Sequence, residues 1–160
     1  MMPESQSVHP GSKLTDRILR IVAWLERVPH SVLALPLRLA VATVFWNSAM
    51  TKLADWNAAL QLFREDYRVP LLAPEFAAYL AVSIELTTPV LLVLGLATRP
   101  VALVLLGMTT VIEVFVYAQA WPTHIQWAAM LLVLLCRGAG KLSLDYLICR
   151  GFSSRPASRV

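Results

Sequence analysis

The sequence contains few of the residues that build metal, haem or disulfide sites. Its 160 residues include three histidines and two cysteines, and Cys136 and Cys149 stand in neither a CxxC nor a metal-ligand spacing. His124 is the only histidine near a long apolar run, so haem held by paired transmembrane histidines has no support. There is also no phosphate-binding glycine loop, nucleophile elbow or HExxH motif. We expect no metal site, no catalytic residue and no cofactor bound covalently or by motif.

The sequence is also poor in charge. Only 15% of its residues are charged and 58% are hydrophobic, whereas soluble domains carry ~25% charged and ~45–50% apolar residues. This composition predicts an integral membrane protein. The net charge of +4 does not indicate nucleic acid, because the basic residues cluster at the two chain ends, where they would meet anionic lipid. No cleavable signal peptide is expected, because the first 30 residues lack a continuous apolar core.

Four apolar runs are present instead. A helix crosses a ~30 Å hydrocarbon core with ~20 residues. The fold class that we predict is an all-α integral membrane protein, a four-transmembrane-helix bundle with an N-terminal amphipathic interfacial helix. The predicted membrane domain covers residues 32–136, with spans at about 32–50, 76–96, 101–117 and 124–136. The last run is short and would need Trp121 and a snorkelling Arg137 at its ends.

Two polar segments flank the predicted membrane domain. Residues 1–31 are expected to form a cytoplasmic tail and an amphipathic helix that Thr15 caps and Pro29 ends, suited to the headgroup plane. Residues 137–160 are expected to form a basic cytoplasmic tail, with an interfacial turn at 142–149. Residues 51–75 are expected to form a solvated loop with a short helix at 56–63.

The distribution of Lys and Arg outside the spans predicts the orientation. With four spans, ten of these residues share one side of the membrane and three lie on the other. The ten are Lys13, Arg17, Arg20, Arg27, Arg99, Arg137, Lys141, Arg150, Arg155 and Arg159; the three are Lys52, Arg64 and Arg68. We therefore expect a multi-pass protein of the bacterial inner (plasma) membrane, with both termini in the cytoplasm.

Each of the two central runs contains one acid, and these acids are the first candidate site. Glu85 and Glu113 lie at similar depth, about 16–20 Å along their helices from the turn at Arg99. An ionisable group at that depth costs at least ~2.5–3.5 kcal/mol, so each acid needs a partner, a proton or water. Other polar residues lie on the same helix faces as the two acids, at helical spacing from them. The candidate intramembrane polar site consists of Arg38, Glu85, Thr88, Thr109, Glu113 and Tyr117.

The pattern leaves the role of these residues open. In one interpretation two polar stripes meet and line an internal cavity. In the other, Arg38 neutralises one acid, the second stays protonated, and the network only fixes helix packing. Arg38 could instead snorkel to the cytoplasmic surface. A second candidate site is the outer rim, where Asn47, Lys52 and His124 close different spans on one side; ordinary interfacial anchoring is the alternative.

The chain resembles the DoxX family over residues 37–147. The resemblance is carried by Arg38, the SAMTKL segment at 48–53, Pro70, Glu85, the GLATR segment at 95–99, His124 and the LSLD segment at 142–145. One departure is Ala139, where the family's closing motif usually reads Gly-Pro-Gly. The resemblance implies a four-helix inner-membrane protein of bacteria. Its relatives include the membrane subunit of thiosulfate:quinone oxidoreductase, partners in oxidoreductase complexes that handle oxidative stress, and proteins encoded beside metal-binding peptides.

The expected function follows from the resemblance together with the buried polar residues. We expect a membrane subunit auxiliary to a redox or oxidative- or metal-stress system, not an enzyme by itself, that offers a quinone or small-molecule pocket in the bundle. The expected partners are the lipid bilayer and a redox or metal-binding protein, with a homo-oligomer possible and no nucleic acid. The alternatives are a small proton- or metal-linked transporter acting as an oligomer, and a ligand-free assembly or anchor protein.

Overall fold

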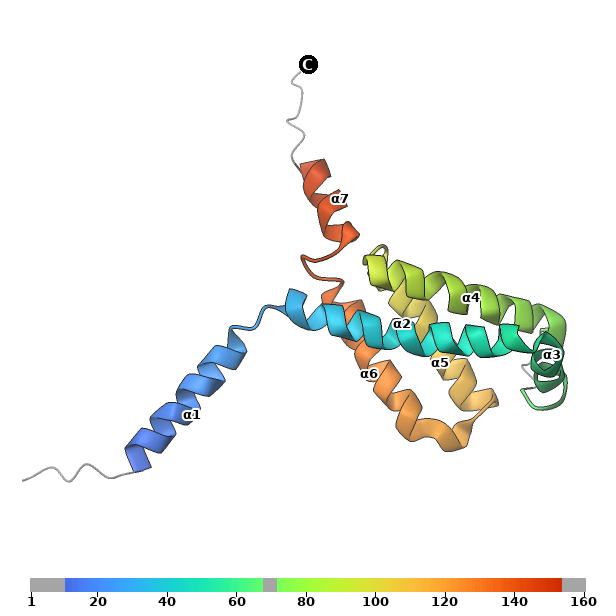
Figure 1. Ribbon diagram of the computed structural model, residues 1–160, viewed down its shortest axis with the longest axis horizontal. Coiled ribbons are helices and arrows are strands. Elements are labelled where there is room, and N and C mark those ends of the chain that lie inside the picture. The colour runs from blue at the N-terminus through green and yellow to red at the C-terminus, as the bar shows by residue number, and fades with distance from the viewer. Residues whose placement is uncertain (1–10, 68–71, 154–160) are drawn as a thin grey trace, which may run out of the picture.

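The computed structural model describes residues 11–67 and 72–153, and within them every regular element is helical (Figure 1). The helices are α1 (Gly11–Glu26), α2 (His30–Ala54), α3 (Trp56–Glu65), α4 (Pro74–Leu94), α5 (Thr98–Phe115), the 3₁₀ helix η1 (Ala118–Ala120), α6 (Trp121–Arg137) and α7 (Leu144–Ser153). The predicted all-α class is therefore confirmed. Arg68, Pro70 and the outer ends of the two predicted polar segments, residues 1–10 and 154–160, lie outside the described residues.

Three of the described helices are long and apolar enough to cross a membrane. They are α2, α4 and α5, which correspond to the first three predicted spans. Helix α6 covers the fourth predicted span with 17 residues, and its crossing stays a prediction. Helix α2 continues to Ala54, beyond the predicted end of its span, so Lys52 lies in a helix and not in a solvated loop.

The bundle is built from two closely packed helix pairs. Helix α4 packs mainly against α2, and α5 packs mainly against α6, with α3 lying across one end of α2 and α4. Starting from the short turn that joins them, α4 and α5 diverge along their length (Figure 1). The main hydrophobic core lies in the half of the bundle nearest that turn and includes Phe45, Leu92, Leu105 and Leu131. In the other half α4 and α5 are farther apart, which leaves room for a cavity.

The turn between α4 and α5 depends on backbone conformations that few residues adopt. Gly95 ends α4 with φ of 66°, in the left-handed region, and its amide donates to carbonyls of the last helical turn. Ala97 precedes α5 with φ of 50°. Left-handed geometry costs a residue with a Cβ ~1–2 kcal/mol, which explains glycine at position 95. Because the turn is tight, the end of α4 and the start of α5 lie together at one end of the bundle, and the two helices separate from there.

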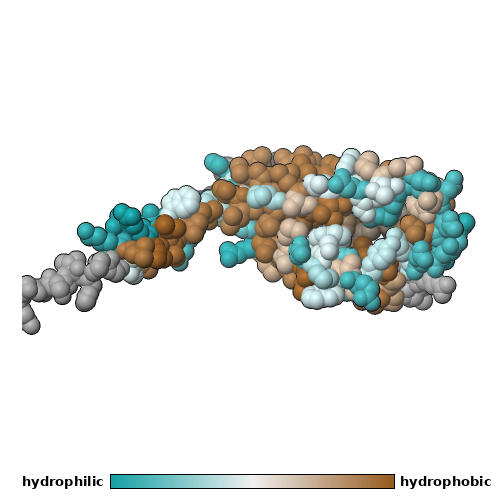
Figure 2. Space-filling model, turned by 60° about the horizontal axis from the view of Figure 1, so that its bottom comes forward, coloured by the Kyte–Doolittle hydropathy of each residue, from teal (hydrophilic) through white to brown (hydrophobic). Residues whose placement is uncertain are grey.

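Helix α1 lies apart from the bundle and is almost wholly exposed (Figure 1). Its exposed residues include large apolar side chains, among them Ile18, Val22 and Leu25. In the space-filling view, hydrophobic and hydrophilic residues gather on different sides of this helix, and hydrophobic residues cover much of the bundle (Figure 2). The hydrophilic residues of the bundle concentrate at the end where α3 lies.

Candidate functional site

A cavity of about 590 Å³ lies in the half of the bundle away from the turn. Side chains from α2, α4, α5 and α6 line it, together with Phe63 of α3 and Tyr67. Most of the lining is apolar. The polar groups that carry chemistry are Ser48, Lys52, Tyr67, Glu85, Tyr117 and His124. One cavity thus contains residues that the sequence placed in two separate sites.

Lys52 and Glu85 form an ion pair in the wall of this cavity. The Lys52 ammonium nitrogen lies 2.7 Å from Glu85 Oε1 and 2.8 Å from Oε2, and the Glu85 side chain is 1% exposed. Ser48 completes the network: it accepts from Lys52 at 2.7 Å and donates to Glu85 Oε1 at 3.0 Å. Ser48 and Lys52 are four residues apart in α2, so they lie on one helix face. The buried carboxylate is fully paired.

Glu113 and His124 form the second polar pair. His124 Nδ1 lies 2.6 Å from Glu113 Oε2, and the ring packs against Trp127 at a centroid distance of 5.1 Å. The His124 side chain is buried, whereas that of Glu113 is 32% exposed. Since Nδ1 is engaged by the carboxylate, Nε2 is the ring nitrogen left to meet a ligand. A carboxylate that orients a histidine in this way also fixes its tautomer.

Two tyrosines, Tyr67 and Tyr117, also line the cavity. The rings of Tyr67 and Tyr117 meet edge to face with centroids 5.6 Å apart, and Phe63 packs against Tyr67 in the same manner. Burial raises the pKa of Tyr67 above its ordinary value, and its hydrogen bond with Tyr117 and the nearby carboxylates of Glu85 and Asp66 add to that rise. The Tyr67 hydroxyl therefore stays protonated and hydrogen-bonded to Tyr117.

Arg38 belongs to the other end of the molecule. It is fully buried, its Nη2 donates to the carbonyl of Leu142 at 2.7 Å, and a Cβ at Gly95 would overlap its Nη1. Asp145 lies near Arg38 and accepts from the amides of Ala97 and Thr98 at 2.7 and 3.0 Å. The structure thus brings Arg38 together with neither Glu85 nor Glu113. Its contacts fasten the segment before α7 to the α4–α5 turn.

The two threonines of the predicted intramembrane site make local hydrogen bonds. Thr88 donates to the carbonyl of Ile84 at 2.7 Å, and Thr109 donates to the carbonyl of Leu105 at 2.8 Å. Both therefore satisfy their hydroxyls within their own helices. Asn47 lines the cavity, as the outer-rim interpretation would place it. Helix α4 runs through Pro89 to Leu94 without interruption.

Sequence reasoning missed Ser48 and Tyr67 as residues of the site. The signal for Ser48 was its spacing of four from Lys52, but that spacing matters only once α2 extends past Met50. Tyr67 follows α3 in a segment read as a solvated loop. Its position against Tyr117 depends on the packing of α3 over α2 and α4, which no local pattern shows.

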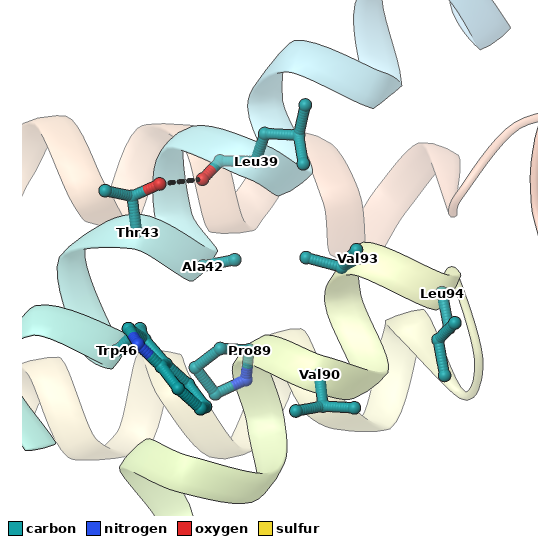
Figure 3. A pocket seen from close by; sticks show the side chains of 8 residues that line it. All are labelled: Leu39, Ala42, Thr43, Trp46, Pro89, Val90, Val93 and Leu94. Carbon is teal, nitrogen blue, oxygen red and sulfur yellow. Dashed lines mark hydrogen bonds between the residues drawn. The ribbon is translucent and has the colours of Figure 1, made fainter.

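A second hollow of about 360 Å³ lies on the outer face between α2 and α4 (Figure 3). Trp46 and Pro89 face each other across it, and Val90 and Val93 lie along one side. Its one hydroxyl, that of Thr43, donates to the carbonyl of Leu39 at 2.9 Å. The hollow is lined almost wholly by apolar side chains and offers no charge, in contrast to the polar cavity.

The charges of the polar cavity cancel in pairs, and this restricts the ligands that suit it. The ion pair of Lys52 and Glu85 is neutral overall, and the pair of Glu113 and His124 carries at most one negative charge. A free anion would find no uncompensated cation among these groups. Among the described residues no group of three or more His, Cys, Asp or Glu side chains is placed to hold a metal ion. The cavity favours a neutral, mainly apolar molecule with a few hydrogen-bonding atoms.

Comparison with known proteins identifies relatives in sequence. A family model described as DoxX matches residues 33–118, which include most of α2, all of α3, α4 and α5, and the cavity residues Lys52 and Glu85. The chain is also 28% identical over 141 residues to an uncharacterized protein of Haemophilus influenzae, covering 82% of this chain and 93% of that one. No solved structure matches the chain.

Proposed function

Because the chain belongs to the DoxX family, as the match over more than half its length shows, we propose that it is a quinone-binding membrane subunit. In this proposal the protein assists a redox or oxidative- or metal-stress system of the bacterial inner membrane. It does not catalyse the reaction by itself. The single observation that carries the proposal is the cavity, in which apolar walls surround two paired charges and a tyrosine pair.

A quinone ring suits this cavity in size and in chemistry. It is neutral and flat, and its two carbonyl oxygens accept hydrogen bonds. The hydrogen-bonding groups of the lining are the Lys52 ammonium, which Ser48 and Glu85 hold in place, the hydroxyls of Tyr67 and Tyr117, and Nε2 of His124. Pockets of ~300–1,000 Å³ with apolar walls and a few placed polar groups are typical small-molecule sites, and the volume of about 590 Å³ lies within that range.

The pair of Glu113 and His124 supplies groups for proton exchange when the quinone is reduced or its quinol oxidised. His124 faces the cavity, while its partner Glu113 is about one-third exposed, so the pair connects the buried space with the surface. Histidine is the side chain that most often moves protons near neutral pH, and the carboxylate of Glu113 holds this one in place. The electrons come from a partner protein that contacts the bundle and carries a redox centre.

The proposed threading has four spans with both termini in the cytoplasm. Helix α6, with 17 residues, extends about 25 Å at ~1.5 Å per residue, and its terminal Trp121 and Arg137 would reach the two interfaces. Helix α1 would lie in the headgroup layer with Ile18 and Leu25 toward the lipid chains. The cavity end of the bundle, with His124, would then face the periplasm.

A transporter is the weaker alternative. The cavity and the buried charges would also fit an ion pathway. However, both carboxylates already have a partner at hydrogen-bond distance, at 2.7 Å for Glu85 and 2.6 Å for Glu113. A paired carboxylate binds a passing cation less readily than a free one. Proton or metal flux into liposomes containing the purified protein would favour the transporter.

The proposal is tested by measuring the binding of a decyl-tailed benzoquinone to the purified full-length protein in nanodiscs. We expect saturable binding to the wild-type protein. Ala81→Trp fills the cavity and should weaken binding at least tenfold, whereas Val93→Trp, in the outer hollow of Figure 3, should not. Binding that is unsaturable, or equal in all three proteins, would reject the quinone site.

A further inference from the structure

We infer that the ligand of the cavity carries an apolar tail, which leaves the bundle sideways through the opening between α4 and α5. This inference rests on the proposed function and deepens it, because it names the class of quinone and its path. The ring would occupy the polar end beside Lys52, Glu85 and His124. The tail would lie in the hydrocarbon side of the wall.

The opening is defined by residues that belong to the cavity wall and to the outer surface at once. Leu80 of α4 is 42% exposed, and Val104 and Val111 of α5 are 46% and 37% exposed, yet all three line the cavity. A wall residue with that much exposure stands at an edge and not in a sealed interior. The cavity therefore reaches the surface on this side of the bundle.

Together with the partly buried Ile84 and Met108, these exposed wall residues form one stripe on each helix. Ile84 follows Leu80 by four positions on α4, and Met108 and Val111 follow Val104 by four and seven on α5. Residues at these spacings share a helix face. The five side chains are apolar, so the two stripes make an apolar passage with no charge to desolvate.

The packing of the bundle explains why a passage exists between these two helices. Helix α4 packs mainly on α2, and α5 mainly on α6, so α4 and α5 are held together chiefly by the turn at Gly95 (Figure 1). The opening lies along membrane-spanning helices. Its surroundings in the membrane are lipid chains, which are the phase that dissolves an apolar tail and excludes a charged ligand.

The outer hollow of Figure 3 is an apolar groove that is not connected to the polar cavity. It also lies against α4, but its lining residues Val90, Val93 and Leu94 do not line the polar cavity. A tail could rest there, but its ring would find no charged side chain. The continuity between polar cavity and apolar opening is what points to a tailed ligand.

The inference is tested by comparing a decyl-tailed benzoquinone with its tail-less parent in nanodiscs containing the full-length protein. We expect the tailed compound to bind at least tenfold more tightly. Val104→Trp should weaken binding of the tailed compound at least fivefold more than that of the tail-less compound, so that the advantage falls to about twofold or less. Val93→Trp is the matched control and should preserve the advantage. Equal weakening of both compounds by Val104→Trp, or no loss of the advantage, would overturn the inference.

A second measurement separates failure of the opening from failure of the quinone site. A nitroxide is attached at Val104→Cys in a protein whose Cys136 and Cys149 are replaced by serine, and its collisions with oxygen and with a water-soluble nickel complex are measured in vesicles. We expect high oxygen and low nickel accessibility. If the accessibilities are as expected but no quinone binds, the proposed quinone-binding function is wrong, and the opening between α4 and α5 is still supported. Low oxygen accessibility at this position would overturn the opening even if quinone binds.

Discussion

The ammonium group of Lys52 contacts both carboxylate oxygens of Glu85, at 2.7 and 2.8 Å, and this contact joins α2 to α4 across the cavity. Neither helix could keep its charge in an apolar wall alone, since desolvation costs several kcal/mol per ion. Ser48 fixes the position of the pair, because its hydroxyl forms hydrogen bonds with both Lys52 and Glu85. The site is thus assembled by helix packing and then fixed by its own hydrogen bonds.

Breaking this pair from one side should be costly. We expect Lys52→Met to lower the free energy of unfolding by about 3–5 kcal/mol, because Glu85 is left charged and buried. The double variant Lys52→Met, Glu85→Leu should recover a large part of the loss, because it removes both charges. Thermal unfolding in detergent measures both. A double variant as unstable as the single one would show that the pair does not act as a charge-compensated unit.

The α4–α5 turn should tolerate no side chain at Gly95. Gly95→Ala introduces a Cβ at φ of 66° and into the space of the Arg38 guanidinium, so we expect a loss of at least about 1–2 kcal/mol in the free energy of unfolding. Gly107→Ala is the matched control. No atom lies within 4 Å of a Cβ there, and the change should raise helix stability by ~0.5–1 kcal/mol. Equal melting temperatures for the two variants would contradict this account.

Asp145 should matter more than an ordinary helix cap. Asp145→Ala removes the acceptor of two amides, those of Ala97 and Thr98, and the charge beside Arg38. Asp55→Ala removes the acceptor of one, that of Ala58. A lost cap costs ~0.5–2 kcal/mol, so we expect Asp55→Ala within that range and Asp145→Ala above it. Chemical unfolding of both variants decides the order; the reverse order would contradict the role of Asp145 at the turn.

The raised pKa of Tyr67 predicts a loss of stability in alkali. In the folded protein Tyr67 keeps its proton at a pH where the unfolded chain ionises it, at about pH 10. Above that pH the unfolded state binds fewer protons than the folded state, so the free energy of unfolding falls as pH rises. Tyr67→Phe should flatten this fall. Stability measured from about pH 8 to 11 tests it, and an equally steep fall in the variant would show that another group is responsible.

Much of the fold follows from the sequence because apolar runs and their breaks are local signals. The runs at 76–96 and 101–117 and the turn between them appear with boundaries shifted by two or three residues. The DoxX resemblance is confirmed by the family match. The end of α2 was placed too early, because Lys52 reads as a loop residue until Glu85 is known to face it.

The sequence predicts most of the residues of the candidate site, but it does not predict which of them contact one another. Glu85 and Glu113 were recognised as acids that need partners, and both have one, Lys52 and His124. These partners had been assigned to a separate rim, because helical spacing places residues along one helix and not between helices. Arg38, the nearest cation by depth, is instead turned to Leu142. Which basic residue meets which acid depends on helix rotation, and that is set by packing of the whole bundle.

The central claim is that the cavity holds a quinone, and the most direct measurement is the quinone content of the protein as it leaves the membrane. The full-length protein is purified in mild detergent from bacterial membranes, extracted with organic solvent and analysed by mass spectrometry, beside the Ala81→Trp variant prepared in the same way. We predict near-stoichiometric isoprenoid quinone in the wild-type protein and a large reduction in the variant. Wild-type protein that carries no more quinone than the filled-cavity variant would contradict the account.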